Sequence, residues 1–295
     1  MTEQNKAKLA QIVSMTIFGT LGIFYRNIPV SSGELALYRA LLATLLIGAF
    51  LLLTRQRIPF RKIRREIPIL LASGMAMGIN WILLFEAYRY TTVSVATLSY
   101  YFAPVIVTAV CPILFKERLT AKQILCFVAS TAGLALITVG GSDAGGNAHL
   151  RGILIGLGAA SFYATVVLLN KFIKNVDGIH RTFLQFLAAA VILIPYVLFS
   201  SGVTVQSMDY VGWINLLIVG LVHTGVTYCL YFSSLKNLTG QTAAILSYVD
   251  PLVAVIVSVT VLHEGITALQ IVGGALILGF TLLNEIDLKK LHSGS

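Results

Sequence analysis

The sequence predicts an all-α membrane protein whose ten transmembrane helices form two inverted five-helix repeats. Three observations lead to this prediction: apolar runs of membrane-spanning length, an internal repeat with a constant offset, and a one-sided distribution of Lys and Arg. Of the 295 residues, 57% are hydrophobic and only 11% are charged, whereas about a quarter of an ordinary soluble domain is charged. This composition is typical of a polytopic membrane protein.

Ten apolar runs are long enough for a membrane-spanning helix. They exceed the roughly ten residues of a transmembrane β-strand and lack a two-residue alternation, so helices are favoured over a barrel. The N-terminus is polar and shows no cleavable signal peptide. The predicted spans lie near residues 8–25, 33–54, 67–88, 92–115, 120–140, 151–171, 180–200, 210–234, 241–262 and 266–285.

The two halves of the chain repeat each other without a gap at an offset of 147 residues (251 − 104 and 264 − 117). The predicted domains are a first repeat over residues 1–147 and a second over 148–295. Because each repeat holds five spans, an odd number, the second must enter the membrane from the other side. The matched pairs include Tyr101 with Tyr248, Pro104 with Pro251, Glu117 with Glu264, Thr120 with Thr267, and Gln123 with Gln270.

The Lys and Arg residues outside the spans predict the orientation. With the N-terminus inside, seventeen fall on the cytoplasmic side and three outside, namely Arg26, Arg89 and Arg151. This asymmetry predicts a cell-membrane protein with both termini in the cytoplasm. It also accounts for the net charge of +9 without a nucleic-acid partner. The densest cluster, at 55–65, is either a plain cytoplasmic loop or a contact for anionic lipid headgroups.

Several shorter features complete the prediction of the fold. Residues 140–147 and 200–209 are predicted as exposed external loops. Glycine pairs at 74 and 78, and at 152 and 156, have the spacing that allows helices to approach closely. The three cysteines lie inside predicted spans without metal-binding spacing and are expected to be small packing residues: Cys111, Cys126 and Cys229.

The ninth predicted span, 241–262, carries one acid, Asp250, directly before Pro251. At 1.5 Å per residue this acid lies about 14 Å deep, close to the middle of the hydrocarbon layer. The proline frees backbone carbonyls, which a membrane tolerates only beside protein or a watered cavity. The repeat has neutral Ala103 at the matching position, so the fold itself does not require an acid. Asp250 is therefore either functional or a protonated acid that binds the freed backbone.

Glu86 is the other acid noted within a predicted span, near the outer end of the third. Isolated charges in a membrane are rarely left unpaired, so a partner is expected among Arg89, Arg39 and Arg26. The resulting pair is either structural or part of a gate. The candidate gate residues are Glu86 and Arg39.

His223 lies in the eighth span, with Thr227 one turn further along the same helix face. A lone histidine in a membrane is either a satisfied packing residue or a proton carrier. The candidate proton-coupling residues are Asp250 and His223. Aromatic and polar residues at similar depths could line a substrate site with them, although Tyr and Trp are also common in helix packing: Asn80, Trp81, Tyr100, Tyr101, Tyr163, Thr227, Tyr228, Ser247 and Tyr248.

The duplicated block consists of a mid-helix proline, an acid-containing turn (KERLT at 116–120, HEGIT at 263–267) and Gln-Ile at 123–124 and 270–271. It resembles the EamA repeat of the drug/metabolite transporter superfamily, and the segments 87–96 and 234–243 are also similar to that family. The resemblance covers nearly the whole chain. It implies ten helices, cytoplasmic termini, a central cavity and the export of amino acids, other metabolites or drugs. The resemblance implies that four residues belong to the scaffold of the fold: Pro104, Pro251, Glu117 and Glu264.

We therefore expect a secondary transporter, most simply an exporter of small amino-bearing metabolites such as amino acids, working by alternating access about hinges at Pro104 and Pro251. A buried acid with aromatic walls favours an ammonium group. Proton coupling and facilitated diffusion remain alternatives, as does efflux of cationic drugs or organic amines. No enzymatic motif is found, so no catalytic residue, cofactor or metal is expected. The expected partners are a small-molecule substrate, protons and lipids, in a monomer or homodimer.

Overall fold

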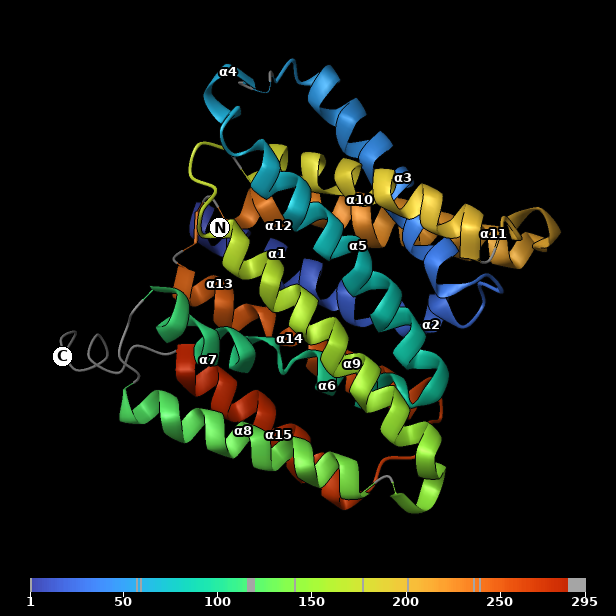
Figure 1. Cartoon of the computed structure of the whole chain (residues 1–295), viewed down its shortest axis with the longest axis vertical. Helices are drawn as coiled ribbons and strands as arrows, with labels where there is room; N and C mark the ends of the chain where they lie inside the picture. Colours follow the sequence, from blue (N-terminus) through green and yellow to red (C-terminus); the bar gives the residue numbers. More distant parts are fainter. Residues whose placement is uncertain are drawn as a thin grey trace.

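The computed structural model describes residues 2–56, 58, 60–115, 120–140, 142–176, 178–200, 202–235, 237–238 and 240–285. Within these ranges the chain forms helices and turns and no strand, which confirms the prediction of an all-helical chain. Figure 1 shows most helices running side by side in one bundle. Glu117, named in the repeat, lies outside the described residues.

In the described part of the chain, eight helical segments are long and apolar enough to cross a membrane, and two further apolar helices, Ile245–Thr260 and Ala268–Asn284, are shorter. The first half of the chain contains α1 (Glu3–Gly19), α2 (Leu21–Tyr25), α3 (Ser32–Leu53), α4 (Phe60–Ile63), α5 (Ile67–Tyr90), α6 (Val93–Tyr100), α7 (Ala103–Phe115) and α8 (Ala121–Gly140). The second half contains α9 (Ser142–Asn170), α10 (Gly178–Ser200), the 3₁₀ turn η1 (Val205–Ser207), α11 (Tyr210–Leu217), the π-helix η2 (Ile218–Val226), α12 (Thr227–Leu235), α13 (Gly240–Ser247), α14 (Val249–Thr260) and α15 (Ala268–Glu285).

The fourth and ninth predicted spans are both interrupted, and each break comes just before a proline. Pro104 is the second residue of α7 and Pro251 the third residue of α14. The first turn of a helix has no intrahelical partner for its N–H groups, so proline is tolerated there. Each proline therefore begins the second half of a divided span. The breaks fall at Tyr101 and Tyr248.

The glycine pairs noted in the sequence lie at close helix contacts, as predicted. A Cβ atom on Gly74 would lie 2.5 Å from the carbonyl oxygen of Gln185 in α10. A Cβ atom on Gly152 would lie 2.7 Å from the Thr91 side chain. Only a residue without a side chain allows these backbones to approach so closely. These contacts hold α5 against α10, and α9 against the turn that follows α5.

The bundle has two ends, which carry different charge. One end, the basic face, contains residues 60–66, which include three arginines, and the start of α8. There Glu66 accepts a 2.7 Å hydrogen bond from Nδ2 of Asn175, and Lys122 donates to the carbonyl of Asn284. The other end, the opposite face, contains the turns at 26–31, 91–92 and 261–267. There Thr91 bonds to Nδ1 of His149 at 2.8 Å.

Two segments predicted as exposed loops are more ordered than expected. The junction at 140–147 is helical from Ser142 onward and breaks at Gly146, whose φ of 50° favours glycine. The segment 200–209 includes η1, with Val205 and Met208 buried. Its anchor is Glu34, which accepts hydrogen bonds from the backbone N–H groups of Thr204 (2.9 Å) and Val205 (2.8 Å).

Glu34 is a further acid within a predicted span, and it was not found from the sequence. It is fully buried in the first turn of α3. The sequence does carry a signal, because Ser31 and Glu34 have the spacing of a capping box, and Ser31 Oγ accepts a hydrogen bond from the Glu34 N–H at 3.1 Å. A buried carboxylate that accepts two backbone N–H groups is structural.

We expect Gly273→Ala to destabilise the protein by separating α8 from α15. The backbones touch at Gly133, where an added Cβ would lie 2.6 Å from the Gly273 carbonyl, and the reverse contact at Gly273 is closer still. Overpacking of this kind costs roughly 1–3 kcal/mol. Thermal unfolding in detergent should show a lower midpoint for this variant.

The matched control is Gly279→Ala, on the same helix but with nothing within 4 Å of the added methyl group. Its midpoint should be unchanged or higher, since alanine is the better helix former. Equal midpoints for both variants would contradict the close contact between α8 and α15.

Candidate functional site

A cavity of about 300 Å³ lies in the middle of the bundle. Elements from both halves of the chain line it, whereas the described residues of α8, α10 and α15 contribute nothing to its wall. The wall is mainly apolar and aromatic, with a few polar groups, as is usual for small-molecule sites. Its lining residues are Met15, Phe18, Gly19, Leu21, Gly22, Arg39, Trp81, Leu84, Tyr88, Val93, Thr97, Tyr100, Tyr101, Ala103, Pro104, Tyr163, Tyr228, Tyr231, Ser247, Tyr248, Asp250 and Ala254.

Asp250 is an acid on the cavity wall, in the first turn of α14. Its Oδ2 accepts a 2.6 Å hydrogen bond from the hydroxyl of Tyr101, the residue at the break between α6 and α7. The bond therefore joins the two interrupted spans. The N-terminus of a helix favours negative charge, so the break before Pro251 places Asp250 where a carboxylate is best tolerated.

Gly19 explains how α14 comes close enough to α1 to enclose the cavity. A Cβ atom on Gly19 would lie 2.6 Å from the carbonyl oxygen of Asp250 and 2.6 Å from the Cβ of Val253. A larger residue at position 19 would push α14 outward. The position of Asp250 is thus fixed from both sides, by Gly19 behind its backbone and by Tyr101 at its carboxylate.

The predicted aromatic residues do gather around this cavity. The rings of Tyr100 and Tyr163 have centroids 5.3 Å apart, those of Tyr100 and Tyr101 lie 5.9 Å apart, and those of Tyr101 and Tyr248 lie 6.5 Å apart. Trp81, Tyr228 and Ser247 line the same cavity. The faces of such rings attract cations.

Arg39 also lines the cavity, and the structure does not bring it to Glu86. Its Nε donates a 2.7 Å hydrogen bond to Oγ1 of Thr224, and its guanidinium carbon lies 4.6 Å from the centroid of the Trp81 ring. Glu86 instead accepts hydrogen bonds from Ser32 at 2.7 Å and from Arg89 at 3.5 Å. The two candidate gate residues, Glu86 and Arg39, therefore do not contact each other.

Three of the predicted substrate-binding residues lie outside the cavity lining. Nε2 of His223 is 3.0 Å from Oγ1 of Thr20, and its ring packs edge-on against Phe24. Asn80 donates from Nδ2 to the carbonyl of Ala159 at 2.7 Å, and Thr227 donates to the carbonyl of Val222 at 2.7 Å. Each of these groups has its partner within the helix packing.

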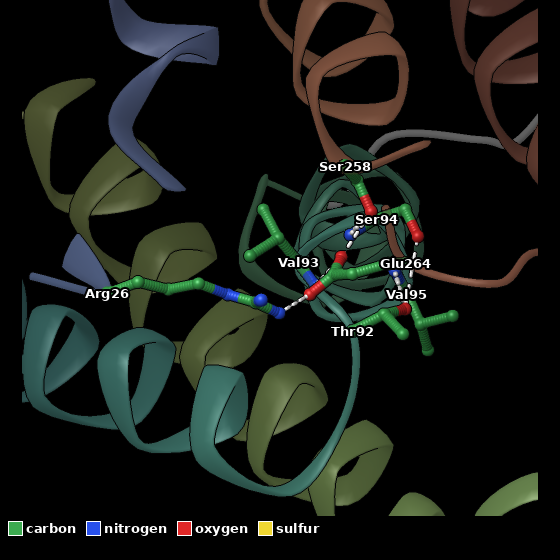
Figure 2. A network of polar contacts seen from close by, with 7 residues as sticks. All are labelled: Arg26, Thr92, Val93, Ser94, Val95, Ser258 and Glu264. Atoms are coloured by element: carbon green, nitrogen blue, oxygen red, sulfur yellow. Dashed lines mark hydrogen bonds and ion pairs between the residues drawn. The ribbon is translucent and has the colours of Figure 1, made fainter. Parts of the chain in front are cut away.

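A polar network around Glu264 joins the end of α2, the start of α6 and the helix α14 (Figure 2). The Glu264 carboxylate pairs with Arg26, accepts from the Ser258 hydroxyl, and accepts a 2.8 Å hydrogen bond from the backbone N–H of Val93. Val93 is the first residue of α6 and a lining residue of the cavity. A carboxylate at a helix N-terminus is well placed to hold that helix in position.

The two interrupted spans meet along only one half of their length. The halves nearer the opposite face, α6 and α14, pack along each other, and Ser94 donates its backbone N–H to Oγ of Ser258 at 3.3 Å. The described parts of α7 and α13, nearer the basic face, make no contact of similar extent. The interrupted spans are therefore packed together towards the opposite face.

The sequence pattern of the EamA-like transporter family matches residues 5–139 and again 150–285. The chain belongs to the EamA-like transporter family. It is 32% identical over 255 residues to the uncharacterized transporter YxxF of Bacillus subtilis (strain 168), covering 86% of this chain and 81% of that protein. It is 26% identical over 275 residues to an uncharacterized transporter of Archaeoglobus fulgidus, covering 93% and 94%.

A solved structure described only as the crystal structure of a protein has the same fold, with a TM-score of 0.64. The sequences are 16% identical, and the match covers 95% of this chain and 97% of the other. The family match identifies the chain as a membrane-embedded transporter.

Some lining residues of this EamA-like transporter were not found from the sequence. Tyr88 lines the cavity, and its hydroxyl lies 3.3 Å from Oγ1 of Thr97, another lining residue. Helical spacing could have found Tyr88, because it lies seven residues after Trp81 and so on the same face of α5. Phe18 and Tyr231 carry no such signal, since their positions depend on how α1 and α12 pack.

We expect Glu264→Gln to loosen the closed end of the cavity. The amide keeps the size of the side chain but loses the charge that Arg26 and the N-terminus of α6 stabilise, and a hydrogen bond to a charged group is worth roughly 1.5–3 kcal/mol. A reporter cysteine at Ala254, a lining residue, should react faster with an impermeant maleimide added at the opposite face. The three native cysteines are first replaced by alanine.

The matched control is Glu86→Gln, which removes an acid bound to Ser32 and Arg89 rather than to α6. Labelling at position 254 should stay at the parent rate in this variant. If Glu264→Gln also left the rate unchanged, Glu264 would not be what keeps this end closed.

Proposed function

We propose that this EamA-like transporter moves small amino-bearing metabolites, such as amino acids, and works as an exporter by alternating access. The observation that carries the proposal is Asp250, an acid on the wall of a central cavity. Among the described residues its side chain bonds only to the neutral hydroxyl of Tyr101. An acid at this depth without a basic partner is suited to receive a cationic group from a ligand.

The aromatic wall supports the same substrate chemistry. An ammonium group bonded to Asp250 would lie among tyrosine rings, whose faces attract cations. This arrangement also suits cationic drugs and organic amines, which are the second candidate class. The two classes differ in whether the substrate carries a carboxylate as well as an amine.

We further propose that the ten helices form two inverted repeats, over residues 1–147 and 148–295, with both termini in the cytoplasm of the cell. The two separate family matches support the repeat, and the Lys and Arg distribution supports the orientation. In this orientation the basic face is cytoplasmic and the Glu264 network closes the outer side. The structure is then the state that is closed to the outside.

During the transport cycle, the packed halves of the two interrupted spans separate and the other halves pack together. The breaks before Pro104 and Pro251 are the hinges of this exchange, and the Tyr101–Asp250 hydrogen bond joins them. Asp250 is also the group that would carry a coupled proton. His223 is the second candidate proton carrier, and its ring bonds to Thr20 rather than to Asp250.

The orientation can be tested by labelling single cysteines. Cysteines at Arg61 and Lys174, on the basic face, should react with an impermeant reagent only from the cytoplasm. A cysteine at Ala148, which is exposed, should react only from outside. Labelling of all three positions from one side would exclude the inverted arrangement.

We expect Asp250→Asn to abolish transport while the protein still inserts and folds. The substitution keeps the shape of the side chain and removes the charge that an ammonium group needs. In proteoliposomes, counterflow of labelled L-leucine and 3-methylbutylamine should fall at least about tenfold, a change of about 1.4 kcal/mol in binding. Measurements with and without a pH gradient show whether protons are coupled.

The control is Asp209→Asn, because Asp209 caps α11 through a 2.8 Å bond from the Gly212 N–H and lies outside the cavity lining. Asparagine caps helices equally well, so this variant should transport at the parent rate. Parent rates and an unchanged pH profile in Asp250→Asn would exclude Asp250 from the site.

A further inference from the structure

Arg39 is a buried cation without an acidic partner. Its side chain is 4% exposed, and no carboxylate lies within 4 Å of it in the described part of the chain. The acids nearest in the sequence are engaged elsewhere, Glu34 with the N–H groups of Thr204 and Val205, and Glu86 with Ser32. A charge left unpaired at this depth is costly unless a ligand or water meets it.

The guanidinium group is held in place from two sides. Its Nε bonds to Thr224, and its plane lies near the rings of Trp81 (4.6 Å) and Phe85 (5.7 Å). These contacts use one of its five N–H groups, and the described residues accept none of the other four. A fixed arginine with free N–H groups matches the geometry of a carboxylate.

The fold explains why Thr224 reaches Arg39. Thr224 lies in the π-helix η2, and its hydroxyl donates to the carbonyl of Val219, five residues earlier, at 2.9 Å. Gly220 and Gly225 of this segment pack directly on Leu42 and Leu46 of α3. Short π-helical segments are frequent at functional sites. Here the segment brings a hydroxyl against a buried arginine.

Arg39 and Asp250 line the same cavity and carry opposite charges. No ion pair joins them among the described residues, so each is available to a ligand. Oδ2 of Asp250 accepts from Tyr101, and its other carboxylate oxygen has no hydrogen bond in the described structure. An amine alone would leave Arg39 unpaired, and a carboxylate alone would leave Asp250 unpaired. A ligand with both groups pairs every charge.

We propose that the cavity is a site for zwitterions, in which Arg39 binds the carboxylate of the substrate and Asp250 binds its ammonium group. This inference rests on the proposed function and narrows it from amino-bearing metabolites to α-amino acids with a free carboxylate. It makes Arg39 a specificity-determining residue that favours amino acids over simple amines and cationic drugs. The aromatic rings then surround the substrate side chain.

The test is a binding and counterflow comparison with matched ligands on the intact protein. The probes are L-alanine, L-leucine and L-phenylalanine, each compared with its methyl ester and with the amine that lacks the carboxylate (ethylamine, 3-methylbutylamine and 2-phenylethylamine). We expect at least one amino acid to bind at least about tenfold more tightly than its ester and its amine. This arm needs no variant, so it stands even if Arg39 variants fold poorly.

The second arm uses Arg39→Gln and Arg39→Lys. In Arg39→Gln the preference for the free amino acid over its amine should disappear, and Arg39→Lys should restore part of it because the charge returns without the fork of N–H groups. A purely structural role for Arg39 would lower the affinity for amino acids and amines alike and leave their ratio unchanged.

Three results would overturn the inference, and they are distinguishable. Equal affinity of the parent protein for amino acids and amines would remove the carboxylate site and leave the proposed function intact. An unchanged ratio in Arg39→Gln would exclude Arg39 as its ligand. If the parent protein neither bound nor transported any probe that carries an amine, the proposed function itself would be contradicted, and this inference with it.

Discussion

A charged side chain inside a membrane needs a partner or a watered cavity, because the hydrocarbon offers it neither hydrogen bonds nor counter-ions. The structure meets this constraint in two ways. Glu34 and Glu264 bind backbone N–H groups at the ends of helices and so become part of the fold. Arg39 and Asp250 face a common cavity and have no charged partner in the described chain, and this difference separates the structural charges from the two that we propose bind the substrate.

Breaks in regular helix geometry hold Arg39 and Asp250 in place. The break at Tyr101 brings a phenol to Asp250, and the break before Pro251 places that acid at a helix N-terminus. The π-helix η2 presents Thr224 to Arg39. Glycine contacts allow the close approaches that these irregular segments require. The site is therefore built from departures from ideal helix geometry, each supported by the packing around it.

Much of this could be predicted from the sequence, because composition, periodicity and the repeat are local or regularly spaced signals. The helical spans, the breaks at Pro104 and Pro251, and the position of Asp250 deep within a span all follow from them. Partners could not be predicted in the same way. The sequence leaves Arg89, Arg39 and Arg26 open as partners of Glu86, of which the structure shows Arg89, and it does not tell whether His223 lies near Asp250. Depth along a helix does not reveal which face a side chain takes or which neighbour it meets. The π-helix, which moves Thr224 towards Arg39, has no sequence signature.

The central claim is that the Asp250 carboxylate meets the ammonium group of the substrate inside the cavity. Infrared difference spectra of protein labelled with ¹³C-aspartate test this directly, with the Asp250 band assigned by its loss in Asp250→Asn. Adding the best-bound of L-alanine, L-leucine and L-phenylalanine should shift the Asp250 band, whereas the matching carboxylic acid without an amine should leave it in place. An Asp250 band that does not move when the amino acid saturates the protein would contradict the account.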